Sequence, residues 1–191
     1  MGFAKNWLEE IVSEWLSLEC YSVEINVPLK SKAGGGRNEA DVLVFMFHGD
    51  ELHIVHAEAT VQLTQSHDDN VEKIKKKFSP NNMDTVLKIA RKKYGDGEIC
   101  STRHIFVSAL ASSSKEARNS KETLKTSNIE CMDFPELIKN CVDALRRYGK
   151  DVSMRRPSDK IFAALPDSLW FMKMLGMMDM YPVLNISEED T

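Results

Sequence analysis

Residues 41–47 (DVLVFMF) and 52–61 (LHIVHAEATV) form two apolar segments, and the short connection HGDE at residues 48–51 joins them. A brief connection that contains a glycine is typical of an antiparallel β-hairpin. Most positions of both segments are apolar on either face, as in strands that are covered on two sides. The sequence therefore predicts a β-hairpin within a sheet that carries helices on both faces.

The segments on either side of this hairpin alternate between helical and strand patterns. Before it, apolar periodicity predicts a helix over residues 3–19 and a strand over 21–27, followed by a glycine-bearing loop over 31–38. After it come a polar break at 65–70, helices at 71–78 and 84–94, a strand at 104–110, a helix at 114–126 and a strand at 128–134. Pro135 opens the last helix of this part of the chain, and we expect Gly149 to close it. This order predicts an α/β fold with a mixed sheet of about five strands flanked by helices.

The length of 191 residues favours one compact domain with an appendage. We assign residues 1–149 to a core domain and residues 150–191 to a C-terminal extension. The extension begins with a polar stretch to residue 160, and residues 169–178 (LWFMKMLGMM) predict a methionine-rich helix. Such a helix either packs on the core or offers a pliable surface to a partner, so a homodimer or a partner protein bound through it is an open alternative.

Composition excludes several classes of protein. Hydrophobic residues make up 42% and charged residues 28%, which is ordinary globular usage and excludes wholesale disorder. The net charge of −4 excludes a globally basic nucleic-acid coat. No apolar run approaches the roughly 18 residues of a membrane span, and acids interrupt the N-terminal segment where a signal peptide is apolar. The four cysteines form no C-x-x-C pair. We expect a soluble, cytoplasmic protein without a structural zinc.

Two acids stand out on the hairpin. Asp41 begins the first apolar segment, and Glu58 lies seventeen residues later, near the end of the second. Acids in apolar strands are unfavourable to bury unless they are paired or bind a cation. If the hairpin brings the two together, Mg²⁺ would relieve their repulsion, and it could activate a water next to a phosphate. Strand-end caps or surface positions are the alternative interpretation.

These acids and the order of elements resemble the PD-(D/E)XK nuclease superfamily, which has a restriction-endonuclease-like three-layer fold. The resemblance extends over residues 4–148 and includes Glu9 on the first helix, the glycines at 34–36, Asp41, and Glu58-Ala59-Thr60. It implies a Mg²⁺-dependent DNA endonuclease, with Mn²⁺ as a substitute, in which Asp41 and Glu58 are metal ligands. Glu9 would be a further acid near the metal, with Glu10 or Glu14 as alternatives if the helix is registered differently.

Thr60 occupies the position where this family has a lysine that stabilises developing charge, and a threonine hydroxyl cannot replace that charge. Three interpretations follow. A lysine of the next helix, Lys73, Lys76 or Lys77, reaches the site; or Gln62, on the same strand face, positions the water; or catalysis is lost. In the last case the chain would be a nucleic-acid-binding or assembly subunit. The candidate catalytic residues are therefore Glu9, Asp41, Glu58, Thr60 and Gln62.

The expected partner is nucleic acid, with DNA preferred. Lysines and arginines are dense between residues 73 and 93, and among them Lys73, Lys76 and Lys77 are the candidate phosphate contacts. An ordinary solvated helix face explains the same pattern equally well. His56 alternates with Glu58 and Thr60 and so shares their strand face, where it would be either a proton carrier or a structural histidine.

Overall fold

The computed structural model describes residues 6–19, 22–31, 37–61, 67–95, 98–109, 115–155 and 165–179. Two compact units make up the chain, residues 1–137 and residues 138–191. The glycines at 34–36 and Gln62 lie outside the described residues.

The first unit is built on a five-stranded mixed sheet. Its strands are adjacent in chain order: β1 (Ser22–Ser31), β2 (Arg37–His48), β3 (Glu51–Thr60), β4 (Ile99–Ser108) and β5 (Ile129–Asp133). The pairs β1–β2 and β2–β3 are antiparallel, whereas β3–β4 and β4–β5 are parallel. The predicted hairpin, the crossovers of the back half and the α/β class with a mixed sheet are thereby confirmed.

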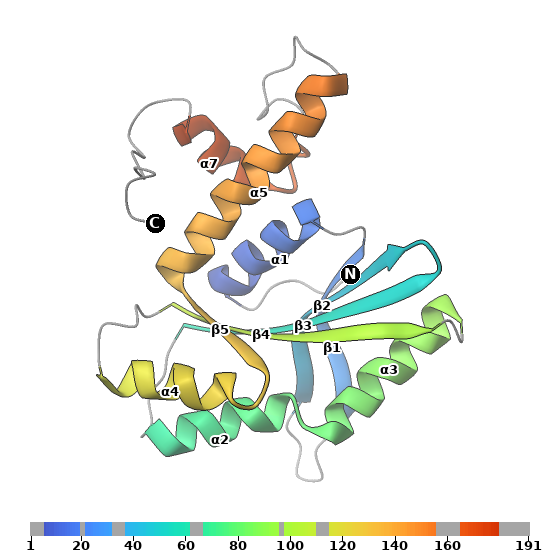
Figure 1. Cartoon of the computed structure of the whole chain (residues 1–191), viewed down its shortest axis with the longest axis vertical. Coiled ribbons are helices and arrows are strands. Elements are labelled where there is room, and N and C mark those ends of the chain that lie inside the picture. Colours follow the sequence, from blue (N-terminus) through green and yellow to red (C-terminus); the bar gives the residue numbers. More distant parts are fainter. Residues whose placement is uncertain are drawn as a thin grey trace. The chain divides into compact units, whose positions relative to one another are not determined.

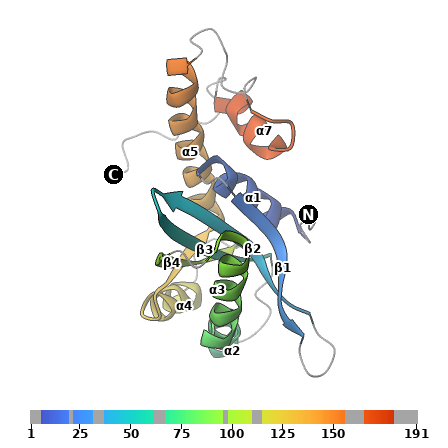
Figure 2. The same ribbon diagram turned by 90° about the vertical axis from the view of Figure 1, so that its right-hand side faces the viewer.

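Helices lie on both faces of this sheet. Helix α1 (Trp7–Glu19) covers one face, and α2 (His67–Lys77), α3 (Pro80–Tyr94) and α4 (Lys115–Lys125) lie on the other (Figure 1). The quarter turn in Figure 2 shows the same separation. Helix α1 buries Leu8, Ile11, Val12 and Trp15, whose spacing of three or four residues places them on one stripe. The apolar stripe predicted from the sequence is therefore the surface that packs on the sheet.

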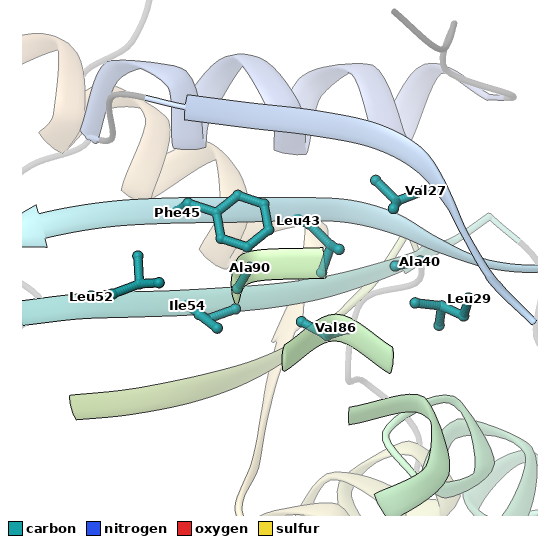
Figure 3. Packing of buried hydrophobic residues seen from close by; sticks show 9 residues of the cluster. All are labelled: Val27, Leu29, Ala40, Leu43, Phe45, Leu52, Ile54, Val86 and Ala90. Carbon is teal, nitrogen blue, oxygen red and sulfur yellow. The ribbon is translucent and has the colours of Figure 1, made fainter. Parts of the chain in front are cut away.

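One apolar cluster joins β1, β2 and β3 to α3 (Figure 3). On β2, Leu43 and Phe45 are two residues apart and so point to the same face of the strand. On α3, Val86 and Ala90 are four residues apart and share one face of the helix. All four are completely buried. Because burial of a side chain such as Leu or Phe contributes about 1.5–3 kcal/mol, this cluster fixes the hairpin against α3.

A second apolar cluster holds α2 in place. Val71, Ile74 and Phe78, from α2 and the residue after it, pack with Phe106 of β4 and with residues of α4 and β5. Their spacing of three and four residues defines the face of α2 that is turned toward the protein interior. The polar residues on the flanks of that face are consequently held at fixed positions beside the sheet.

Several predicted boundaries are wrong. Asp41 does not begin a strand, because β1 and β2 pair beyond it as far as Ser31 and Arg37. Helix α2 begins at His67, inside the predicted polar break; Asp69 lies in its first turn, where acids favour the positive end of the helix dipole. Gly149 does not end the helix predicted to open at Pro135, since α5 (Phe134–Arg155) continues through it into the stretch predicted as polar tail.

The second unit contains most of α5 and the helix α7 (Trp170–Asp179), which is the predicted methionine-rich helix. Met172 and Leu175 of α7 are buried, whereas Trp170, Met174 and Met177 are exposed. In the described ranges, no helix has the length and apolar character needed to cross a membrane.

Candidate functional site

Both hairpin acids line one cavity of about 340 Å³ in the first unit. The cavity draws its walls from α1, β2, β3, α2 and β4. Its lining residues are Glu9, Asp41, Glu58, Ala59, Thr60, Asn70, Lys73, Ile74, Lys77 and Phe106. The fold thus brings together most of the residues that the sequence singled out, and it places acids and lysines around the same space.

Asp41 lies on β2 and turns its carboxylate toward β3. Its Oδ2 accepts a hydrogen bond of 2.9 Å from the backbone N–H of Ala59. Burial, followed by the negative charge of Glu58, raises the pKa of Asp41 from 3.8 to about 7, against the opposing influence of Lys77 and of the Ala59 N–H. A carboxylate in this position favours any cation that reaches the cavity, because a cation stabilises its charged form.

Glu58 on β3 is almost fully buried and is held by two partners. Its Oε1 lies 2.7 Å from Nε2 of His56, and its Oε2 lies 2.6 Å from Nζ of Lys77. Burial opposes ionisation of Glu58, but the hydrogen bond from His56 and the positive charge of Lys77 outweigh it and lower the pKa. Glu58 is therefore the ionised acid of the pair at neutral pH, when Asp41 is near its midpoint.

Lys77 is the last residue of α2. Besides its ion pair with Glu58, Nζ donates a hydrogen bond of 3.1 Å to the backbone carbonyl of Glu39 on β2. Burial disfavours its charge, yet the nearby carboxylates of Glu58 and Asp41 raise the pKa of Lys77 above its ordinary value. A protonated ammonium thus stands beside the two acids.

The other two candidate lysines differ in position. Lys73 is exposed and lines the cavity one turn before Lys77. Lys76 does not line it; its ammonium pairs with Glu72 on the exposed face of α2, at 2.7 Å. Of the three lysines proposed from the sequence, the structure therefore places Lys77 against the acids and Lys73 in the wall of the same cavity.

Glu9 combines a structural contact with proximity to the acids. The side chain of Asn6 accepts hydrogen bonds of 3.0 Å from the backbone N–H groups of Leu8 and Glu9, and it donates one of 2.6 Å to Oε1 of Glu9. This arrangement caps the start of α1. The negative charge of Glu9 also raises the pKa of both Asp41 and Lys77.

The remaining sequence candidates divide between those that reach the cavity and those that do not. Neither Glu10 nor Glu14 lines the cavity, so Glu9 is the acid that α1 contributes to its wall. Thr60 lies in the wall two residues beyond Glu58. Lys77 lines the same cavity, so the helix supplies a cation to the space where the strand carries the Thr60 hydroxyl.

His56 lies beneath Glu58 and is completely buried. A carboxylate oxygen only accepts hydrogen bonds, so Nε2 of His56 carries the proton in their contact. The imidazole packs on Phe78 with ring centroids 4.8 Å apart, and Phe78 packs in turn on His104 at 5.1 Å. His56 is therefore a rigid donor that fixes one oxygen of Glu58.

Asp41 and Glu58 are the candidate ligands for a divalent cation in this cavity. Within the described part of the chain, no three side chains of His, Cys, Asp or Glu converge closely enough to form a complete metal cage. Magnesium does not need one, because it commonly takes one or two carboxylates and keeps several waters. In such a site Asp41 and Glu58 would supply the carboxylates, and the cavity of about 340 Å³ has room for several waters.

Asn70 is a cavity residue outside the set predicted from the sequence. It falls in the predicted polar break, whereas α2 already includes it. Asn70, Lys73 and Lys77 follow one another at spacings of three and four residues and so lie on one flank of α2. This spacing is the signal that could have placed the three residues together on one helix flank.

Comparisons of the chain with protein-family models, with curated proteins and with solved structures give no match. What the site does is therefore inferred from its residues and their geometry.

Proposed function

We propose that this chain is a divalent-metal-dependent DNA endonuclease of the PD-(D/E)XK type, in which Lys77 supplies the charge that Thr60 cannot. The observation that carries the proposal is the Lys77 ammonium, 2.6 Å from Oε2 of Glu58, in the cavity that Asp41 also lines. A cation held at a fixed place beside the acids can stabilise the negative charge that develops in a phosphodiester transition state. The restriction-endonuclease-like fold is part of the proposal. It is supported by the order of elements along the chain, in which α1 is followed by the hairpin that carries the two acids and then by parallel strands.

In this proposal Asp41 and Glu58 hold Mg²⁺, or Mn²⁺ in its place. The bound ion supplies a Lewis acid for the phosphate and a water of lowered pKa. Lys77 stabilises the negative charge that develops on the phosphate oxygens. Lys73 and Asn70, on the same wall, contact the substrate phosphate. Glu9 adds negative potential that favours cation binding.

The test is a cleavage assay on single- and double-stranded DNA with Mg²⁺ or Mn²⁺. We expect Asp41→Ala, Glu58→Gln and Lys77→Met each to lower the rate by about 10²-fold or more. Lys76→Met is the matched control, because Lys76 is the neighbouring lysine but does not line the cavity. Metal-dependent cleavage that survives both acid substitutions would disprove the site assignment.

A second candidate function rests on a specific contact. Both oxygens of Glu58 are engaged by protein groups, His56 and Lys77, so the cluster is electrostatically satisfied without an added ion. This favours a catalytically silent nucleic-acid-binding or assembly subunit. Calorimetric titration separates the two: a silent subunit binds DNA without binding Mg²⁺ or Mn²⁺, whereas the nuclease binds the metal through Asp41.

A further inference from the structure

Asn82 is a buried amide on α3 that lies close to Lys77 but outside the cavity lining. Its Nδ2 donates hydrogen bonds to the backbone carbonyls of Lys76, at 3.1 Å, and Lys77, at 2.8 Å. These carbonyls end helix α2, where the last four carbonyls have no partner within the helix. The Asn82 side chain therefore caps the end of the helix that carries the site lysine.

The same amide also reaches the sheet. Oδ1 of Asn82 accepts a hydrogen bond of 2.7 Å from Nδ2 of Asn38 on β2. The orientation of the amide is forced by its partners, because two carbonyls can only accept and must face the NH₂ group. Asn82 thus links the end of α2 to strand β2.

These contacts form a closed path around Lys77. Its backbone carbonyl is bound to Asn82, and Asn82 is bound to Asn38. The next residue of β2, Glu39, receives the hydrogen bond from Nζ of Lys77 on its carbonyl. The backbone of Lys77 is therefore tied through Asn82 to Asn38, and its ammonium is bound directly to Glu39, the next residue of the same strand.

We propose that Asn82, acting with Asn38, is a positioning residue that sets the reach of the Lys77 ammonium to Glu58. A lysine stem has four rotatable bonds, and the end of a helix frays readily, so the placement of the ammonium depends on fixing the backbone from which it extends. The consequence for catalysis rests on the proposed function, whereas the placement of Lys77 does not.

Placement is tested by amine labelling of the metal-free protein, read by mass spectrometry well below the melting temperature. In Asn82→Ala, Lys77 loses its fixed contact with Glu58 and its amine is released to solvent, so we expect its labelling rate to rise about tenfold, the effect of losing one charge-assisted hydrogen bond. Lys73 and Lys76 serve as internal references, and Asn81→Ala, at the exposed neighbouring position, is the matched control. A Lys77 labelling rate that matches wild type, relative to these lysines, overturns the proposal.

Two further variants keep the labelling test decisive. Asn82→Asp retains the acceptor for Asn38 but replaces the donors to the helix carbonyls, so we expect it to release Lys77 as Asn82→Ala does. If either Asn82 variant fails to fold, Asn38→Ala removes only the link to the strand. Unchanged labelling of Lys77 in Asn38→Ala would then overturn the proposed link between Asn82 and the strand.

The catalytic consequence is tested by a double-mutant cycle on DNA cleavage. We expect Asn82→Ala to lower kcat by about 10–100-fold while KM stays within a factor of about two, because a displaced catalytic group costs this much in rate. In the Lys77→Met background the same substitution should have no further effect on kcat. Additive losses overturn the proposal. An inactive wild-type chain would refute the nuclease function, and the labelling result would still decide the placement.

Discussion

The Lys77 ammonium lies 2.6 Å from Oε2 of Glu58, so the last residue of α2 delivers its charge to the end of β3. Thr60, two residues beyond Glu58, lines the same cavity. The positive charge in the cavity therefore comes from the helix, whereas the nearby strand position carries a hydroxyl. The two side chains can be exchanged by mutation to test whether the charge must come from the helix.

Exchange of the lysine between the two positions is the first prediction. We expect Lys77→Met to lower DNA cleavage by about 10²-fold and the double variant Thr60→Lys, Lys77→Met to recover part of that loss, because the charge returns to the cavity from β3. Single-turnover cleavage rates measure both effects. Thr60→Ala is the control for loss of the hydroxyl alone. A double variant no faster than Lys77→Met would show that the charge must come from the helix.

Metal binding should depend on pH through Asp41. Its pKa is about 7, so below pH 6 the carboxyl group is mostly protonated and a cation must displace the proton. Below this pKa we expect the affinity for Mn²⁺ to rise by about tenfold with each unit of increasing pH, and above pH 8 we expect it to level off. Calorimetric titration from pH 5.5 to 8.5 measures it. Asp41→Asn should bind Mn²⁺ as weakly at every pH as wild type does at the lowest pH, and an affinity independent of pH in wild type would contradict the assignment.

The same carboxyl group should destabilise the metal-free fold at high pH. Between pH 3.8 and about 7 the folded protein retains a proton on Asp41 that the unfolded chain has released, so the free energy of unfolding falls as pH rises. The Asp41→Asn substitution keeps an acceptor for the Ala59 N–H but removes the charge. We expect this variant to be more stable than wild type by up to about 4 kcal/mol at pH 8, with little difference near pH 4.

Urea unfolding in a metal chelator measures this difference. Glu58→Gln provides the opposite control, because the pKa of Glu58 is lowered and its ionised form stabilises the fold at neutral pH. That variant should lose stability at pH 8. A stability gain from Asp41→Asn that is equal at both pH values would show that the effect comes from packing rather than from charge.

The hairpin and its acids could be predicted from the sequence because their signals are local. Two apolar runs and a short turn specify the pairing of β2 with β3, and that pairing brings Asp41 close to Glu58. The position of Asp41 inside its strand could not be predicted, since β2 is extended by pairing with β1 beyond the acid.

The choice among the lysines depends on how α2 is rotated against the sheet. That rotation is fixed by burial of Ile74 and Phe78 against Phe106, a contact between distant segments. Spacing alone groups Lys73 with Lys77, but it does not say that this flank faces the acids. Asn82 has no sequence signal, because its role depends on β2 and the end of α2 meeting at one point.

His56 should act on metal affinity through Glu58. Loss of its hydrogen bond frees Oε1 of Glu58, and loss of a group that orients a metal ligand commonly lowers affinity by about 10–100-fold. We expect this for Mn²⁺ binding by His56→Leu. His104→Leu is the matched control, because His104 packs on the same Phe78 ring, while its Nε2 makes no hydrogen bond within the described residues. Equal losses in both variants would indicate general loosening of the core.

Lys73 should contribute to DNA affinity as a phosphate contact. It is exposed, lines the cavity and lies one turn from Lys77, so bound DNA would release a counterion at this point. We expect Lys73→Gln to weaken binding and to reduce the slope of log K against log salt by about one, measured by fluorescence anisotropy in a metal chelator. Lys92→Gln, at an exposed position on α3 away from the cavity, should leave the slope nearly unchanged. If instead Lys92→Gln lowers the slope and Lys73→Gln does not, DNA follows α3 rather than the acidic cavity, and phosphate would not reach Asp41 and Glu58.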